Sequence, residues 1–366
     1  HVLYSEQMAA VYEEIAKQLL NQDEDSAYYK IAMKAQKYVD FHVVGAFESP
    51  QLFPRYKTVD GEKVWLPLND QSWPPDLDRV PAKARGETVY FWLVVPRKEI
   101  SARGKGEPAP VVVLSHGYTS NRFEALMFGA YLARHGLATL AIDCPSHGLA
   151  LSKSEQLLAK GLGAVYGLGP FVEAALTDRA LDMNNDGKKD SGGDYWTAYM
   201  FHTRDQVRQS ALDYMQLIRV FRGFDGTRTW KHDPLGTGKP GVAGDFDGDG
   251  KVDVGGSAQF HMTGGSLGGI MSFLVGGIEP ALTTIVPVAG AGALGDVALR
   301  SRQGGVPEPV ILRVMGPLYV GTLDSKSGSM KLETIIPDLN DKKELPLATV
   351  EGVSPGDTMV VDNLVN

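Results

Sequence analysis

The segment Thr263–Gly269, TGGSLGG, surrounds one serine with four glycines. The apolar residues before it, AQFHM, predict a buried strand, and the residues from Leu267 onward, LGGIMSFLVGGI, predict a helix. The glycines matter because a sharp, strained turn brings strand and helix so close that only hydrogen side chains fit between them. The segment therefore predicts a strand–turn–helix unit with Ser266 on the turn.

Strands and helices alternate through the chain around this turn. Continuous apolar runs such as PVVVL predict strands that are buried on both faces, as in a parallel sheet. We expect strands at 87–98, 110–117, 137–148, 258–264 and 282–290, and helices at 122–136, 203–224 and 267–278. This order predicts an α/β fold, with a mostly parallel sheet flanked by helices.

Composition and hydrophobic pattern divide the chain into three parts. Residues 1–86 are expected to form an N-terminal helical and irregular extension. Residues 87–300 are expected to form the core, with a glycine-rich cap insertion at about 150–200. Residues 301–366 are expected to be a β-rich segment and an incomplete domain, because the sequence stops directly after an apparent strand that has no hairpin partner.

Within the extension, apolar residues at helical spacing predict helices at 5–20, with Ser5 as a possible N-cap, and at 26–39. Residues 41–81 are rich in Pro, Asp and Trp and predict irregular chain.

Bulk composition excludes several classes of partner. The net charge is −8 over 366 residues, which argues against nucleic acid or an anionic membrane surface. No run of about 18 uncharged apolar residues occurs, so no transmembrane segment is expected. The single cysteine, Cys144, excludes a disulfide within the chain.

The turn also matches a short catalytic pattern. Gly264–Gly268 reads G-x-S-x-G, and it has the strand before it and the helix after it that this pattern requires. The helix N-terminus behind Ser266 would direct backbone N–H groups at a developing oxyanion. A glycine-rich turn that carries a serine by chance is the alternative interpretation.

A second turn, His116–Tyr118, ends the PVVVL strand, and together the two turns resemble the α/β-hydrolase superfamily. The resemblance covers roughly residues 87–292, and within the superfamily the elbow and the long insertions look most like bacterial secreted lipases and esterases. It implies an α/β-hydrolase fold, Ser266 as nucleophile, and the backbone amides of Tyr118 and Leu267 as oxyanion donors.

The histidines depart from that family pattern, in which the order along the chain is Ser, Asp or Glu, then His. All eight precede Ser266, at positions 1, 42, 116, 135, 147, 202, 232 and 261. Three explanations compete. The acid and base lie in a missing C-terminal piece, which we favour; the base is recruited from elsewhere, with His147 the best candidate; or the fold carries no hydrolase chemistry. His116, His147 and His261 are otherwise expected to be structural.

Two acidic loops, Asp182–Asp190 and Asp245–Asp253, share the pattern D-x-[DN]-x-D-G-x-x-D. This resembles the calcium loops of dockerins and EF-hands, in which oxygens at positions 1, 3, 5, 7 and 9 bind one cation. The expected ligands are Asp182, Asn184, Asp186, Lys188 and Asp190 in the first loop, and Asp245, Asp247, Asp249, Lys251 and Asp253 in the second, with the two lysines contributing backbone carbonyls.

The loops depart from an EF-hand at position 12, where Gly193 and Gly256 replace the usual glutamate. Modest affinity is therefore expected, with calcium in a structural role, because the cation relieves repulsion between crowded carboxylates. Solvated acidic turns are the alternative. Weak calcium sites favour a secreted, periplasmic or cell-surface location.

These observations predict a calcium-stabilised serine esterase or lipase that acts on a small-molecule or lipid ester through an acyl-serine intermediate. If the acid and base lie in a missing piece, a second polypeptide that carries the rest of the fold is the expected partner. A peptidase of the same fold and a non-catalytic calcium-binding surface protein are the alternatives.

Overall fold

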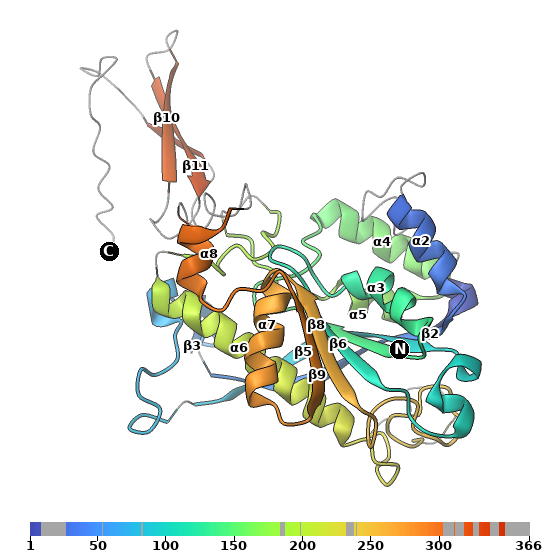
Figure 1. The fold of residues 1–366 in the computed structure, drawn as a ribbon. Coiled ribbons are helices and arrows are strands. Elements are labelled where there is room, and N and C mark those ends of the chain that lie inside the picture. The colour runs from blue at the N-terminus through green and yellow to red at the C-terminus, as the bar shows by residue number, and fades with distance from the viewer. Residues whose placement is uncertain are drawn as a thin grey trace.

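The computed structural model describes most of the first 302 residues and three later strands (Figure 1). The described residues are 1–8, 27–52, 54–81, 83–183, 187–197, 199–231, 238, 240–302, 311, 318–324, 329–336 and 344–347.

A seven-stranded sheet forms the centre of the molecule, in the order β1-β2-β5-β7-β6-β8-β9. Its strands are β1 (Val2–Tyr4), β2 (Val39–Gln51), β5 (Arg85–Pro96), β6 (Val111–Ser115), β7 (Ala138–Ile142), β8 (Phe260–Gly265) and β9 (Leu282–Val288). The four strands β6 to β9 run parallel, whereas β1, β2 and β5 pair antiparallel. The predicted α/β fold with a mostly parallel sheet is confirmed.

Helices cover both faces of this sheet. On one face lie α6 (Met200–Arg222) and α7 (Leu267–Ile278), and on the other lie α2 (Ala27–Gln36), α3 (Glu124–Ala133) and α5 (Gly169–Leu176). The residues of β6 divide between the two layers, because Val111 and Val113 join the core under α6 and α7 while Leu114 joins the core under α3. This two-sided burial is the physical reason for the continuous apolar runs in the sequence.

The expectation of irregular chain at 41–81 is wrong. β2 is thirteen residues long and pairs with β5 from Val39 to Gln51, so the sheet extends into the predicted N-terminal extension. Pro50, which suggested a loop, lies one residue before the end of this strand. Extended pairing with β5 therefore outweighs the local composition.

A hairpin also lies in this segment, formed by β3 (Tyr56–Val59) and β4 (Glu62–Trp65). Its turn is Asp60-Gly61, and both residues have a positive φ, at 51° and 85°. An Asp-Gly pair at this position is a strong hairpin signal, because the favoured two-residue turn requires a positive φ at both residues.

The predicted cap insertion contains α4 (Lys153–Val165) followed by α5. Ser152 caps α4, since its hydroxyl accepts the Glu155 N–H while the Glu155 carboxylate accepts the Ser152 N–H. Beyond α8 (Leu294–Arg300), β10 (Leu318–Asp324) and β11 (Ser329–Ile336) project away from the sheet (Figure 1), and a third antiparallel strand, β12 (Glu344–Leu347), pairs with β11.

Part of the expected structure lies outside the described residues. Residues 5–8 are helical, but the rest of the helix expected at 5–20 is not described, nor is the apparent strand at the end of the sequence. Among the described residues, no helix has the length and apolar character needed to cross a membrane.

Candidate active site

Ser266 is the single residue between the end of β8 and the start of α7. Its backbone has φ 54° and ψ −114°, a strained conformation for a residue with a side chain. The residue is exposed, and its N–H donates to the Val288 carbonyl at 3.0 Å. The predicted strand–turn–helix unit is therefore present, with the hydroxyl group at the surface.

The glycines of this turn allow its backbone to lie directly against the ends of the neighbouring strands β6 and β9. A Cβ atom on Gly264 or Gly268 would overlap the carbonyl oxygen of Ser115, at the end of the neighbouring strand β6. A Cβ on Gly269 would lie 2.6 Å from the Val288 oxygen. By contrast, a Cβ on Gly265 would meet nothing within 4 Å. Close packing therefore requires glycine at three of the four positions.

The two predicted oxyanion donors lie in turns at the same edge of the sheet. β6 and β8 are adjacent and parallel, with Ser115 paired to Gly264, so the turn after each strand emerges beside the other. A Cβ on Gly117 would lie 3.8 Å from the Gly265 oxygen, which places the Tyr118 turn against the Ser266 turn. Leu267 is the first residue of α7, where an N–H group has no acceptor within the helix.

His116 is buried in the wall of this site. Its Nε2 accepts the Cys144 N–H at 3.0 Å, so Nδ1 carries the proton and donates to the Gly117 oxygen at 2.8 Å. Both ring nitrogens are occupied in holding the turn together, as the structural role expected for His116 requires.

His147, the candidate alternative base, is completely buried. Its Nδ1 donates to the Pro145 oxygen at 2.9 Å, and its Nε2 has no hydrogen-bond partner among the described residues. A Cβ on Gly192 would lie 2.8 Å from this Nε2, so backbone closes off the ring there. Burial lowers the pKa of His147 to about 3. The structure does not bring its ring into hydrogen-bonding contact with Ser266.

The other histidines also lie away from the Ser266 hydroxyl. His42 accepts the Trp92 indole N–H, His202 contacts Asp194, His261 lies within β8 and His135 is exposed. His232 falls outside the described residues. In the described part of the chain, no hydrogen bond joins a histidine to Ser266.

The first acidic loop is closed by hydrogen bonds from its own backbone. Asp182 Oδ2 accepts the Gly187 N–H at 2.9 Å, and Asp190 Oδ2 accepts the Met183 N–H at 3.0 Å. The Asp190 N–H donates to the Leu181 oxygen at 2.6 Å. Lys188 is exposed. Two predicted ligands, Asn184 and Asp186, lie outside the described residues.

The second loop repeats these three hydrogen bonds at equivalent positions. Asp245 Oδ2 accepts the Gly250 N–H at 2.8 Å, and Asp253 Oδ2 accepts the Phe246 N–H at 2.7 Å. The Asp253 N–H donates to the Gly244 oxygen at 2.8 Å. The two loops therefore share a backbone arrangement as well as a sequence pattern.

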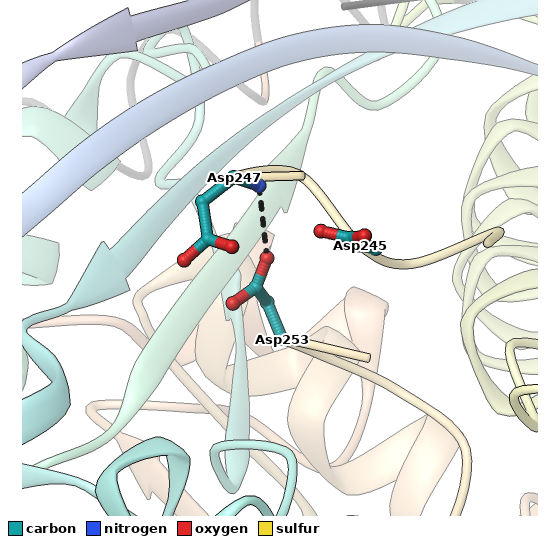
Figure 2. Close-up of side chains that lie close together, drawn as sticks. All are labelled: Asp245, Asp247 and Asp253. Carbon is teal, nitrogen blue, oxygen red and sulfur yellow. Dashed lines mark hydrogen bonds between the residues drawn. The ribbon is translucent and has the colours of Figure 1, made fainter. Parts of the chain in front are cut away.

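Carboxylates converge in the second loop (Figure 2). Asp245, Asp247 and Asp253 each place an oxygen within 4.8 Å of the others, and burial raises the pKa of Asp253 to about 6. Arg103 donates to Asp253 at 2.7 Å and to Asp247 at 2.7 Å, while Lys98 lies 2.7 Å from Asp247. Sequence reasoning did not identify these two basic residues.

The remaining members of this loop lie at its outer side. Asp249 and Lys251 are exposed, and Asp249 pairs with Lys98 at 2.7 Å. Arg103 also donates to Asp40, 63 positions earlier in the chain. No local pattern could reveal these partners, since Arg103 and Asp253 are 150 positions apart.

A cavity of about 290 Å³ lies elsewhere, between the β3–β4 hairpin and the segment after α5. Its lining includes Arg55, Arg85, Arg179 and Glu87 but not Ser266. Arg122 closes one side, where it pairs with Asp143 and donates to carbonyl oxygens at the end of α5.

The strand order and the strand–turn–helix unit at Ser266 define an α/β-hydrolase fold. No family model matches the sequence, and a search of curated proteins finds no similar one.

Solved structures share a general likeness at low sequence identity. An acetyl xylan esterase from Paenibacillus sp. R4 is 18% identical over 79% of this chain and 61% of its own, with a TM-score of 0.29. A cold-adapted esterase from an Arctic intertidal metagenomic library is 13% identical over 67% and 59%, with a TM-score of 0.27. Acetyl xylan esterase 1 from Thermoanaerobacterium sp. JW/SL YS485 is 14% identical over 71% and 57%, with a TM-score of 0.27.

This chain thus spans less than two thirds of the length of each of these three proteins. At such identities and TM-scores the likenesses do not assign an activity to it.

The glycine contacts predict opposite results for two neighbouring substitutions. Gly268→Ala should destabilise the protein by several kcal/mol, because its Cβ would overlap backbone that cannot move without separating β6 from β8. Gly265→Ala should change stability by less than about 1 kcal/mol, since its Cβ enters open space. Urea unfolding of both variants measures the difference, and equal losses would contradict the proposed packing.

The buried His147 predicts a pH dependence of stability. The pKa of His147 is about 3 in the folded protein and ordinarily 6.5. Between these two pH values the histidine is protonated in the unfolded chain and neutral in the folded protein. Stability is therefore lost as pH falls from about 6.5 toward about 3, by on the order of 1–2 kcal/mol at pH 5. His147→Gln should reduce the difference in unfolding free energy between pH 7 and pH 5 by this amount.

The control for this experiment is His135→Gln at an exposed position. An unchanged pH difference in the His147 variant would show that the imidazole takes up a proton in the folded state.

Proposed function

We propose that this chain carries the nucleophile of a serine hydrolase that acts on carboxylic esters. The observation that carries the proposal is the strained, exposed Ser266 between β8 and α7, with the Tyr118 turn beside it. A hydroxyl at a helix N-terminus next to a second backbone turn has donors on the side where negative charge develops on the substrate.

The reaction follows from this placement. Ser266 Oγ attacks the ester carbonyl carbon and gives its proton to a base, while the carbonyl oxygen takes the negative charge. The amides of Tyr118 and Leu267 bind that oxygen. The alcohol leaves with a proton, and water then releases the acid by the same steps in reverse order.

None of the histidines placed in the structure forms a hydrogen bond to Ser266. We propose that a second polypeptide supplies the acid and the base. Its docking surface would be the free edge of β9, which ends the described sheet (Figure 1), together with the face of β8 and β9 opposite α7.

Exposed apolar side chains on that face support this part of the proposal. Val286 and Val288 are 55% and 54% exposed, although they lie in the middle and at the end of a sheet strand. They lie on the opposite face from Ile285, which packs against α7 at Gly276. Apolar sheet residues that remain exposed are typical of an interface.

One side of α3 also carries exposed aromatic side chains. Phe128 and Tyr131 are 46% and 50% exposed, and they follow Glu124 at the spacing of one helix face. Glu124 accepts the Gly117 N–H two residues after the end of β6, so the first turn of α3 lies beside the Tyr118 turn, while the body of the helix packs on β5 and β7.

We also propose that both acidic loops bind Ca²⁺ as a structural ion. The three converging carboxylates of the second loop are within the span that Ca²⁺–oxygen distances of about 2.3–2.6 Å permit. Asp245 and Asp182 each accept an N–H from the sixth loop residue, a glycine with positive φ, and Asp245 also accepts the Gly248 N–H at 2.6 Å through its second oxygen. The repeated arrangement supports the same ligand in both.

Calcium sites of modest affinity are filled where calcium is abundant, so we propose a secreted, periplasmic or cell-surface location. The substrate is proposed to be a small-molecule or lipid ester.

A fluorophosphonate probe tests the nucleophile. It should label Ser266 in natively purified protein, and Ser266→Ala should abolish the labelling because the reactive oxygen is gone. Ser272→Ala is the matched control, since this α7 serine is buried and bonded to the Gly268 carbonyl. Labelled peptides are identified by mass spectrometry.

Intact mass of the same material decides where the base lies. A second polypeptide that copurifies with labelled protein supports the proposed completion of the site. A single unlabelled chain would instead favour a non-catalytic, calcium-binding protein on this fold.

Removing calcium tests the metal proposal. A chelator should lower the melting temperature by on the order of 5 °C, as loss of a ligand present at about 100 times its Kd predicts. Ser266 labelling at low temperature should persist, because the ion is structural. Asp245→Asn should reduce the chelator effect, whereas Asp296→Asn on the exposed surface of α8 should not. An identical melting curve with and without chelator would refute calcium binding.

A further inference from the structure

The turn that carries Tyr118 has a conformation that it cannot hold alone. Thr119 has φ 65°, a left-handed conformation that is unfavourable for a β-branched residue. Within the turn, only one backbone hydrogen bond is formed, from the Ser120 N–H to the Gly117 oxygen at 3.1 Å. Such a strained turn persists only when its surroundings determine its shape.

Those surroundings are the residues directly after the first acidic loop. The Tyr118 hydroxyl donates to the Gly192 oxygen at 3.1 Å, and the Ser191 hydroxyl donates to the Ser120 oxygen at 3.3 Å. These two hydrogen bonds hold the residues before and after Thr119, Tyr118 and Ser120. The segment is in turn fixed to the turn after β7, because the Gly192 N–H donates to the Ser146 oxygen at 2.7 Å.

Gly192 is required at its position for two reasons. Its φ of +73° is one that residues with side chains rarely adopt. A Cβ there would also lie 2.8 Å from the Tyr118 ring and 2.8 Å from His147 Nε2. Tyr118 therefore packs directly on the Gly192 backbone, with its ring close to those of His147 and Tyr195.

We infer that Ser191 and Gly192 are positioning residues for the oxyanion site: they form no hydrogen bond to Ser266, and they act by holding the Tyr118 turn. This inference rests on the proposed function. Oxyanion donors must lie about 2.7–3.1 Å from the developing charge, and loss of one donor costs about 10²–10³ in turnover. A turn that loosens without unfolding should therefore lose part of that factor.

The experiment uses Tyr118→Phe, which removes the hydrogen bond to Gly192, and Ser191→Ala, which removes the hydrogen bond to Ser120 and also the acceptor of the Gly148 N–H. Each variant should lower the rate of fluorophosphonate labelling and the kcat for ester hydrolysis about tenfold, with KM within about twofold of the wild type. The double variant should lose no more than the factor expected for one missing donor. Tyr166→Phe and Ser154→Ala, at exposed positions on and after α4, are the matched controls.

Hydrogen exchange of the peptide that spans residues 116–121 gives a readout that does not need activity. The exchange should rise in both variants, while the melting temperature stays within about 2 °C of the wild type. A wild-type protein that neither labels nor hydrolyses esters would refute the proposed function, and the exchange would then test the hold on the turn by itself. Unchanged exchange in both variants, or raised exchange with unchanged labelling of an active protein, would overturn the positioning role.

Discussion

The site depends on one close contact, in which the Ser115 carbonyl at the end of β6 lies against the backbones of Gly264 and Gly268. β6 and β8 can lie side by side to their last residues only because Gly264 and Gly268 have no side chains. That approach places the turns after both strands at one edge of the sheet. The strain at Ser266 follows from it, because the chain must reverse within one residue to begin α7. Packing between backbones thus determines where the hydroxyl lies.

The parts of the molecule that lie around this constraint serve to hold turns rather than to add chemistry. His116 uses both ring nitrogens on backbone groups, and Arg122 joins the turn after β7 to the end of α5. Buried polar side chains are stable in such places because each hydrogen bond replaces one to water. The turns at this edge of the sheet are therefore fixed by hydrogen bonds to buried side chains.

Sequence reasoning located the elements whose signals are local. The helix expected at 267–278 has those bounds in the structure, because the serine turn and the apolar run define both of its ends. β2 was missed because its stability comes from pairing with β5, about 45 positions away, and its composition resembles a loop. The Asp60-Gly61 hairpin had a readable signal that was overlooked. In the site, the serine turn and both acidic loops could be recognised from the local sequence. The roles of Lys98 and Arg103 and the hydrogen bond from Ser191 to Ser120 could not, because they depend on contacts between distant segments.

The guanidinium of Arg103 has a consequence for the order in which the chain assembles. It joins Asp40, Asp247 and Asp253, which are 63, 144 and 150 positions away. Contacts between such distant segments form only after the intervening chain has been ordered, since closing long loops costs entropy before any contact is gained. The ion pairs of Arg103 should therefore appear late in refolding, and they fasten the beginning of the sheet to the segment that leads into β8. One side chain thus joins these two segments after the rest of the sheet has formed.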